Sequence, residues 1–385
     1  MKEFLFLEPI VIFILLINVL SASAQTPFTP TKKFTLNGYL KTLQNWQFPD
    51  NGKVYSNHLL HNRLNVKWNI SASLTMAGEW RNRMITGDEL KQFSNYRQLL
   101  KNPNDKWDLS IAWVNQPDMI MLSNTERLWL SYKKNKWFVR AGRQRINWST
   151  TTTWNPNDIF NTYNFLDFDY EERPGCDALQ TRYIINTSSN IELAAGFLGQ
   201  TNKIVGGIKY FKQIRSWDFQ GILGLYENHP TAGISFAGSI SEAGVKGEMQ
   251  FFDDEKNQVL NLSTEADYLF KKGWYGKVGL LYNSKGITEP ITDRRALNFT
   301  MTPIQQMPTA WNMEITAQKE FSPIIKSGTT IIYSPSSNLL LLIPNCSIRL
   351  ADNLEANILI QQFILKENNW NSVVTNGFIR MKYSF

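Results

Sequence analysis

Apolar and polar residues alternate along most of this chain beyond about residue 32, in short segments separated by turn-forming residues. A repeat of two is the side-chain period of a β-strand, and one apolar face with one polar face suits a strand between lipid and water. The last segment, 373–385, shows the pattern most clearly. Its apolar face holds Ile379, Met381, Tyr383 and Phe385.

Eighteen such segments can be placed, and every second connection between them is short and rich in charged or turn-forming residues. Single-chain bacterial barrels have an even number of strands, short turns at the periplasmic end and longer outer loops. The sequence therefore predicts an all-β fold, a transmembrane antiparallel β-barrel of about 18 strands with periplasmic termini. The long outer connections are 47–56, 85–121, 148–175 and 284–308.

Residues 107–115 also resemble a strand, although the alternation of long and short connections places them inside the second outer loop. They either extend a strand above the membrane or fold inward. If they cross the membrane instead, another predicted strand is wrong and the barrel has 16 strands.

The two ends of the chain predict export and insertion. Residues 10–20 form an apolar run too short for a membrane-spanning helix, and small residues follow it, so we expect a signal peptide over 1–24, cleaved after Ala24. The mature barrel is then 25–385. The signal peptide holds one Lys and two Glu, so its removal raises the formal net charge from +7 to +8. The terminal Phe385 resembles the C-terminal signature of outer-membrane barrels, which implies the cell outer membrane, its lipid and the barrel-assembly machinery as partners.

The composition agrees with a barrel, although a large soluble β-sandwich could share it. The chain holds 13 Trp, 14 Tyr and 23 Phe, which suits aromatic belts at the two membrane interfaces. We expect such a belt beside the short turns. Cys176 and Cys346 fall on distant strands and are expected to be free thiols. The belt would include Tyr132, Trp137, Phe270 and Trp274.

Cations gather on the predicted inward face of consecutive strands between residues 57 and 186. A ring or wall of Arg and Lys in a pore favours anions. The alternative is a lattice of ion pairs with wall and loop carboxylates, without selectivity. The predicted basic wall consists of Arg63, Lys67, Arg81, Arg83, Arg127, Arg140, Arg143, Arg145 and Arg182.

Strict alternation over 136–147 would turn Arg143 and Arg145 toward lipid, where an Arg costs about 2–4 kcal/mol near the midplane. A β-bulge at Gly142 would shift the phase by one residue and bring Arg140, Arg143 and Arg145 to the same inward face. We therefore expect a bulge at this glycine.

The loop 148–175 is too rich in aromatic residues to extend into water without cover. It would either tuck into the lumen, narrowing or plugging the pore, or cover its neighbours at the surface. Inside the lumen, its carboxylates would pair with the basic wall. No ligand spacing marks a calcium site or any other metal site among them. The candidate constriction residues are Trp154, Asn157, Asp158, Asp167, Asp169, Glu171 and Glu172.

The stretch 142–148 followed by 155–161 resembles a motif of porin-like outer-membrane barrels of Gram-negative bacteria related to the alginate-export and phosphate-selective-porin groups. The likeness covers 122–182, and Ser149 stands where those relatives usually have Gly. The resemblance implies a channel or channel-like protein and transfers no substrate.

We therefore expect a porin-like channel for passive diffusion of small hydrophilic, anionic solutes. The alternative is a non-conducting barrel that acts in adhesion or in an envelope complex. His58, His61 and His229 are the only histidines, and no nucleophile or nucleotide motif accompanies them, so we expect no enzyme, cofactor or metal. Export argues against nucleic acid as a partner. The sequence leaves open the solute, the state of the pore and whether a homotrimer forms.

Overall fold

The computed structural model describes residues 32–50, 52–92, 96–102, 104–169, 174–199, 203–254, 257–366 and 368–385. The predicted signal peptide 1–24 lies outside these residues, and so do Glu171 and Glu172. None of the helices in the described ranges combines the length and hydropathy of a membrane-spanning helix.

The described chain is built almost entirely from β-strands joined in one antiparallel sheet. Short helices occur only in connections: α2 (Asp88–Gln92), α3 (Tyr96–Leu99), and the 3₁₀ turns η2 (Lys271–Gly273) and η3 (Arg294–Leu297). The strands are β1 (Phe34–Pro49), β2 (Tyr55–Asn69), β3 (Leu74–Gly87), β4 (Ser110–Asn115), β5 (Met119–Lys134), β6 (Trp137–Gln144), β7 (Cys176–Asn186), β8 (Ser189–Leu198), β9 (Lys203–Ile214), β10 (Trp217–Tyr226), β11 (His229–Ile240), β12 (Ala243–Asp254), β13 (Asn257–Leu269), β14 (Trp274–Asn283), β15 (Trp311–Glu320), β16 (Ile325–Ser334), β17 (Leu339–Ala351), β18 (Leu354–Lys366) and β19 (Trp370–Ser384).

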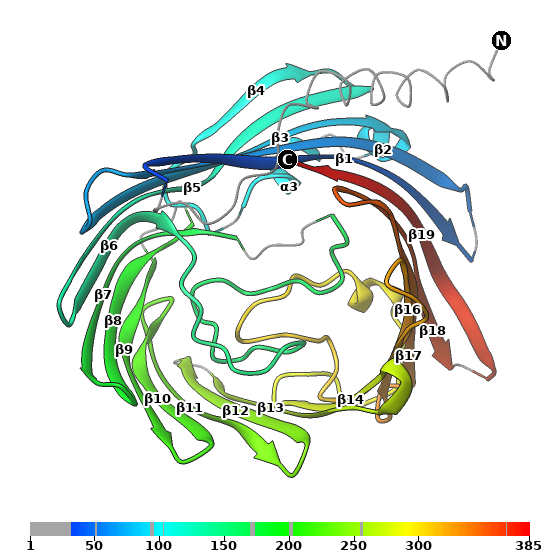
Figure 1. Ribbon diagram of the computed structural model, residues 1–385. Helices are drawn as coiled ribbons and strands as arrows, with labels where there is room; N and C mark the ends of the chain where they lie inside the picture. Colours follow the sequence, from blue (N-terminus) through cyan, green and yellow to red (C-terminus); the bar gives the residue numbers. More distant parts are fainter. Residues whose placement is uncertain are drawn as a thin grey trace.

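The sheet closes on itself because its first and last strands pair (Figure 1). The register of β1 and β19 runs from Tyr39 opposite Ser384 to Pro49 opposite Val374. Phe385 completes the seam, since its N–H donates to the carbonyl of Gly38 and its carbonyl accepts from the Gly38 N–H, each at 3.0 Å. A closed sheet has no unpaired edge, which is the condition for a sheet that faces lipid.

Eighteen strands form the wall of the barrel, as the sequence predicts. The additional strand, β4, pairs only with the N-terminal part of β5, where Ser110–Asn115 lie opposite Asn124–Ile120. It belongs to the second long loop. The strand-like segment 107–115 therefore extends the edge of a wall strand and does not replace one.

The short connections are tight hairpin turns at one end of the barrel, which we call the turn end; the long loops lie at the other, the loop end. Asn135, Arg215, Ser241 and Lys272 sit in these turns with φ between 52° and 63°, the left-handed conformation that two-residue hairpins require.

The outer face is apolar, and aromatic side chains mark both ends of it. Tyr132, Trp137, Phe270 and Trp274 are all exposed beside the turn end. At the loop end Phe48, Trp311 and Trp370 are exposed as well. The predicted aromatic belt is thus matched by a second band at the opposite rim. Cys176 and Cys346 are free thiols, as expected.

Candidate channel interior

The third long loop folds into the barrel. β6 ends at Gln144, three residues short of the predicted strand, and the chain then runs inward (Figure 1, green trace inside the ring). Trp148, Trp154 and Phe160 are at most 1% exposed. Of the two placements that the sequence leaves open for 148–175, the described residues occupy the inner one.

The predicted bulge at Gly142 is absent. Pairing of β6 with β5 keeps one register from Trp137 through Arg143. Gly142 instead has φ +114°, and a Cβ there would lie 2.3 Å from the carbonyl oxygen of Leu128. The bulge lies one strand away. In β5, Glu126 is the extra residue between the pairs Glu79–Arg127 and Trp80–Thr125, so Glu126 and Arg127 both point inward.

Arg143 sits at the seam where β6 leaves the sheet, not in a solute path. Its guanidinium contacts Asp177 at 2.8 Å and Asp105 at 2.8 Å. It also donates to the carbonyl of Thr125 at 2.9 Å and to that of Trp107. The side chain therefore joins β5, β7 and the second long loop at the point where β6 leaves the sheet.

Asp105 is the loop member of this cluster. Burial raises the pKa of its carboxyl to about 8, against the attraction of Arg143, which lowers it. The stability of this cluster therefore depends on how far the attraction of Arg143 offsets the desolvation of the Asp105 carboxylate.

The first half of the inward loop is held by carboxylates of the opposite wall. The backbone N–H groups of Thr151 and Asn157 donate to Glu248 on β12, each at 3.2 Å, and the Thr152 N–H donates to Glu265 on β13 at 2.9 Å. A typical intramolecular hydrogen bond contributes about 0.5–1.5 kcal/mol to stability. In this half of the loop, wall carboxylates accept hydrogen bonds from loop N–H groups, whereas the sequence predicted that loop carboxylates would pair with wall cations.

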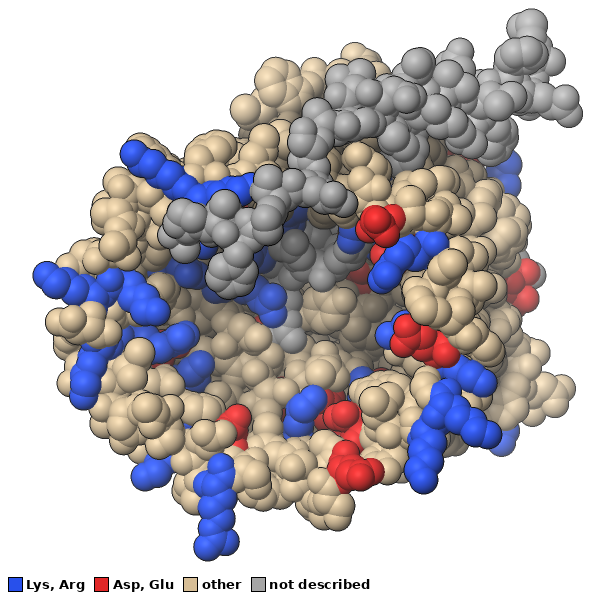
Figure 2. Space-filling view, in the orientation of Figure 1, with Lys and Arg blue, Asp and Glu red and all other residues tan. Residues whose placement is uncertain are grey.

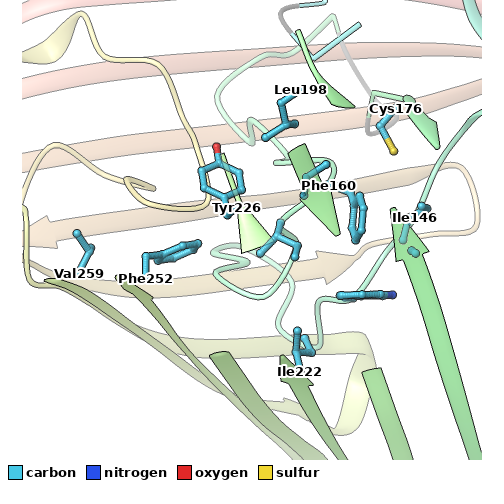
Figure 3. Close-up of a cluster of buried hydrophobic side chains, with 12 residues drawn as sticks. Ile146, Phe160, Cys176, Leu198, Ile222, Tyr226, Phe252 and Val259 are labelled. Carbon is cyan, nitrogen blue, oxygen red and sulfur yellow. The ribbon is translucent and has the colours of Figure 1, made fainter. Parts of the chain in front are cut away.

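Apolar packing backs these hydrogen bonds. Ile146 and Phe160 of the loop contact a buried cluster of wall side chains that includes Ile222, Tyr226 and Phe252 (Figure 3). Trp148 packs edge-on against Phe160, and its indole N–H donates to Glu192 on β8 at 2.6 Å. A core of this kind fixes the loop against one side of the barrel.

The second half of the loop crosses to β1 and β2, where Asp169 is the anchor. Its Oδ1 lies 3.0 Å from Lys41 Nζ and 3.1 Å from His61 Nδ1, and both partners are fully buried. Burial opposes ionisation of Asp169, but His61, Lys41 and Arg81 outweigh it and hold its pKa well below the usual range. Asp169 therefore pairs with Lys41 and His61, neither of which belongs to the predicted basic wall.

Sequence reasoning missed three of the residues that hold this half of the loop. Lys41 and His61 face inward on β1 and β2, opposite each other. Arg380 on β19 lies over the ring of Phe168, 4.5 Å from its centre. The signal was present, since Arg380 alternates with the insertion signature and Lys41 alternates with Leu40 and Thr42, but the predicted basic wall begins only at the second strand.

The fourth long loop, 284–308, also lies inside the barrel (Figure 1, gold trace). Ile291 and Met307 are buried together with Trp154 and with wall residues of β14 to β19. Asn261 on β13 donates to the carbonyls of Pro303 and Ile304, both at 2.8 Å. Two inward loops therefore share one apolar core, which the sequence did not predict.

The nine predicted wall cations do not form one continuous surface. Arg63 pairs with Glu79, Arg81 with Glu126 at 3.2 Å, and Arg182 with Glu192 at 2.6 Å. The lattice of ion pairs, named above as the alternative, is thus present around several of them. Lys67 is exposed near the turn end.

Among the cavities inside the barrel are two that no described residue lines in common. The larger, about 1000 Å³, opens toward the loop end and is lined by Arg81, Arg83, Asp167 and Asp169 among others. The smaller, about 670 Å³, lies at the turn end between β3, β5, β6 and β7. Figure 2 shows the barrel hollowed in the middle with Lys and Arg side chains around the hollow.

The remaining constriction candidates are structural. Asn157 Nδ2 donates to the carbonyl of Ile234 at 3.1 Å, and Asp158 is fully buried beside it. Within the described ranges no group of three or more His, Cys, Asp or Glu is placed to hold a metal ion.

No family model and no curated protein matches this chain. Solved porin structures share its fold. They include OccK11 of Pseudomonas aeruginosa (8% identity, 91% of this chain and 96% of that one, TM-score 0.58) and OccAB4 of Acinetobacter baumannii (9%, 93% and 100%, 0.60). OmpF of Salmonella typhi, in complex with daunomycin, is similar at 12% identity over 91% of this chain and 97% of that one, with TM-score 0.50.

The chain has the fold of outer-membrane porins. At identities of 8–12% this likeness concerns the fold alone. The resemblance of 122–182 to the alginate-export and phosphate-selective-porin groups stays a prediction.

Proposed function

We propose that this protein is an outer-membrane channel for small hydrophilic solutes, narrowed by its own third loop. The carrying observation is the inward course of residues 145–169, tied to β12 and β13 on one side and to β1 and β2 on the other. A surface loop would not need buried ionic anchors on opposite walls. Cavities at both ends of the constriction suit a diffusion path.

We assign the proposed anion preference of the channel to the turn-end cavity. Its described lining holds five cations against one carboxylate, Glu79. The loop-end cavity is lined by four cations and five carboxylates, so it has no excess positive charge. An excess of cations in a confined space concentrates anions. The cations of the turn-end cavity are Arg127, Lys133, Arg140, Arg145 and Arg182.

Reversal potentials in a KCl gradient across a planar bilayer test this assignment. We expect the natural protein to favour chloride and the double variant Arg140→Glu/Arg145→Glu to move the reversal potential toward potassium. Lys271→Glu/Lys272→Glu is the matched control, because it makes the same change in charge on an exposed turn at the same end. Equal shifts in both variants, or none, would refute the role of the cavity.

A non-conducting barrel for adhesion or for an envelope complex is the second candidate. It is favoured by the apolar core that two inward loops build inside the lumen. Purified protein that inserts into the bilayer and carries no current would support it against a channel.

Placement in the outer membrane carries further parts of the proposal. Lipid contacts the apolar outer face, export uses the signal peptide 1–24, and the strand that ends at Phe385 is presented to the barrel-assembly machinery. Protease protection of the loop end but not of the turn end, in intact cells, would contradict this orientation.

A further inference from the structure

Lysine side chains stand on the outer face of the barrel at the turn end, beside exposed aromatic residues. They come from the hairpins β5–β6, β9–β10 and β15–β16, which lie in separate sectors of the closed sheet. They are distinct from the cations of the turn-end cavity, since none of them is among the described residues that line either cavity. We call this set the outer basic belt: Lys134, Lys136, Lys212 and Lys319.

The outward direction of the belt follows from its neighbours. Residues that pair across neighbouring strands point to the same face of the sheet. Three of the lysines lie opposite aromatic residues that are 43–52% exposed on the outer face. The fourth, Lys136, has its ammonium 5.9 Å from the ring centre of Tyr183, which pairs with the exposed Trp137. The three pairs are Lys134 with Trp137, Lys212 with Phe219, and Lys319 with Trp274.

The aromatic neighbours place the belt at the level of lipid headgroups. Aromatic side chains of membrane-spanning proteins concentrate at the two membrane–water interfaces. Lys319 Nζ lies 5.1 Å from the ring centre of Trp274 and 5.1 Å from that of Phe321. A lysine stem packs along apolar surface of this kind while its ammonium stays in polar surroundings. The charges of the belt therefore lie at the height of the phosphate groups of the neighbouring leaflet.

Carboxylates of this chain do not neutralise the belt. None of the four lysines forms an ion pair within the part of the chain that the structure describes. At the loop end, by contrast, exposed and half-exposed cations form ion pairs. These pairs are Lys101 with Asp108, Lys203 with Glu227, Lys285 with Asp254, Arg294 with Asp50, and Arg295 with Asp293. The outer face of the turn end therefore presents positive charge to whatever molecule lies against it.

The partner of the belt must be anionic, lie at membrane level and reach three separate sectors of the wall. Lipid meets these conditions, because it surrounds a barrel on every side. A single protein partner would contact one sector only. A polymer beneath the membrane would meet the turn tips, such as Lys271 and Lys272, before the outward side chains. A headgroup with net negative charge fits better than a zwitterionic one, because the ammonium of a zwitterionic headgroup is repelled by lysine.

We propose that the outer basic belt binds anionic phospholipid headgroups, of the phosphatidylglycerol type, in the leaflet at the turn end. One lysine near an anionic lipid surface shifts association by about fivefold. Averaged over all the lipid around the barrel, the preference falls to about twofold, because much of that lipid lies away from the belt. The inference uses the membrane placement proposed above but not conduction, since a barrel that carries no current can still select its lipid.

Electron paramagnetic resonance of spin-labelled lipids tests the belt on the mature barrel in phosphatidylcholine vesicles. The motionally restricted signal gives the association of labelled phosphatidylglycerol with the protein surface relative to labelled phosphatidylcholine. We expect a preference of about twofold for phosphatidylglycerol with the natural protein and equal association with Lys134→Gln/Lys212→Gln/Lys319→Gln. In about 1 M KCl the natural protein should lose its preference, because the screening length falls to about 3 Å.

The matched control is Lys285→Gln/Arg294→Gln/Arg295→Gln, which removes three cations from the loop end, where each has a carboxylate partner. We expect this variant to keep the lipid preference. A heat-sensitive shift in gel mobility shows that each variant is folded. Vesicle-bound natural protein without a preference, or equal losses in the two triple variants, would overturn the belt and leave the channel to its own recordings. A belt variant that keeps the lipid preference but no longer sediments with purified peptidoglycan would overturn it as well, in favour of the cell-wall polymer.

Discussion

Asp169 is the anchor whose loss should be most visible in conduction. The variant Asp169→Asn keeps the size of the side chain and removes its charge. It leaves the buried Lys41 ammonium without the carboxylate that lies 3.0 Å away. His61 loses the same partner at 3.1 Å.

The cost follows from the burial of the partners. Removing one member of a buried ion pair costs about 3–5 kcal/mol, because the other charge stays out of water. At about 1.4 kcal/mol per factor of ten, the docked state of residues 162–169 loses between roughly two and four powers of ten. The contacts that remain include the Gln361 bond to the Leu166 carbonyl at 2.8 Å, the packing of Phe168 against Phe378 and Arg380, and the bond from Lys41 to the Asp169 carbonyl. We expect these to be too weak to hold the segment continuously.

Single-channel recording is the assay. The natural protein is expected to show one main conductance, and Asp169→Asn to add frequent transitions to a larger one. Asp108→Asn is the control, since Asp108 pairs with Lys101 where both side chains are about one-third exposed, and such pairs contribute about 0–1 kcal/mol. If Asp169→Asn and Asp108→Asn both record like the natural protein, the carboxylate does not hold the constriction.

Three further predictions concern the same loop and its base. Gly142→Ala is expected to destabilise the barrel by about 1–3 kcal/mol, since φ is +114° and the new Cβ would meet the Leu128 carbonyl; urea unfolding followed by tryptophan fluorescence measures it. Arg143→Leu leaves the buried Asp177 without its ion-pair partner, so we expect the free energy of unfolding to fall by about 3–5 kcal/mol in the same assay. An unchanged urea midpoint would show that Arg143 does not stabilise the seam. The pKa of Asp169 is lower in the docked loop than its unfolded-state value of about 4. The ionised carboxylate therefore stabilises docking fully above about pH 4, and this stabilisation is lost only as pH falls through the lower folded-state pKa. Channel records of the natural protein between pH 7 and about 4.5 should therefore lack the larger conductance.

The wall of the barrel could be predicted from the sequence because the alternation of apolar and polar residues within each strand constrains its register with its neighbours. Alternation fixes which side chains face outward, and a slip by one residue would expose every polar one. The short turns add an independent check, since Asn135 and Ser241 fit the positive φ of tight hairpins. Strand number and loop positions then follow without knowledge of any long-range contact.

The interior could not be predicted in the same way, because its contacts join residues far apart in the chain. Thr151 meets Glu248, and Asp169 meets Lys41, without any local pattern that records the pairing. The bulge shows the same limit. Inward placement of Arg127 and Glu126 together is achieved by an extra residue in β5, whereas the sequence offered Gly142 as the more permissive site. A glycine permits an unusual conformation, but the register of neighbouring strands decides where the extra residue goes.

The wall formed by β1, β2 and β3 is polar on both faces, and the two faces have different physical reasons. Inside, Lys41 and His61 hold a carboxylate of the loop, and burial of the lysine is tolerated because the opposite charge of Asp169 lies 3.0 Å away. Outside, Asn62 and Asn82 carry no charge and so need only neutral hydrogen-bonding partners. A strand that faces water has no reason to bury a lysine completely, and Lys41 is buried because the third loop covers this wall from within the barrel.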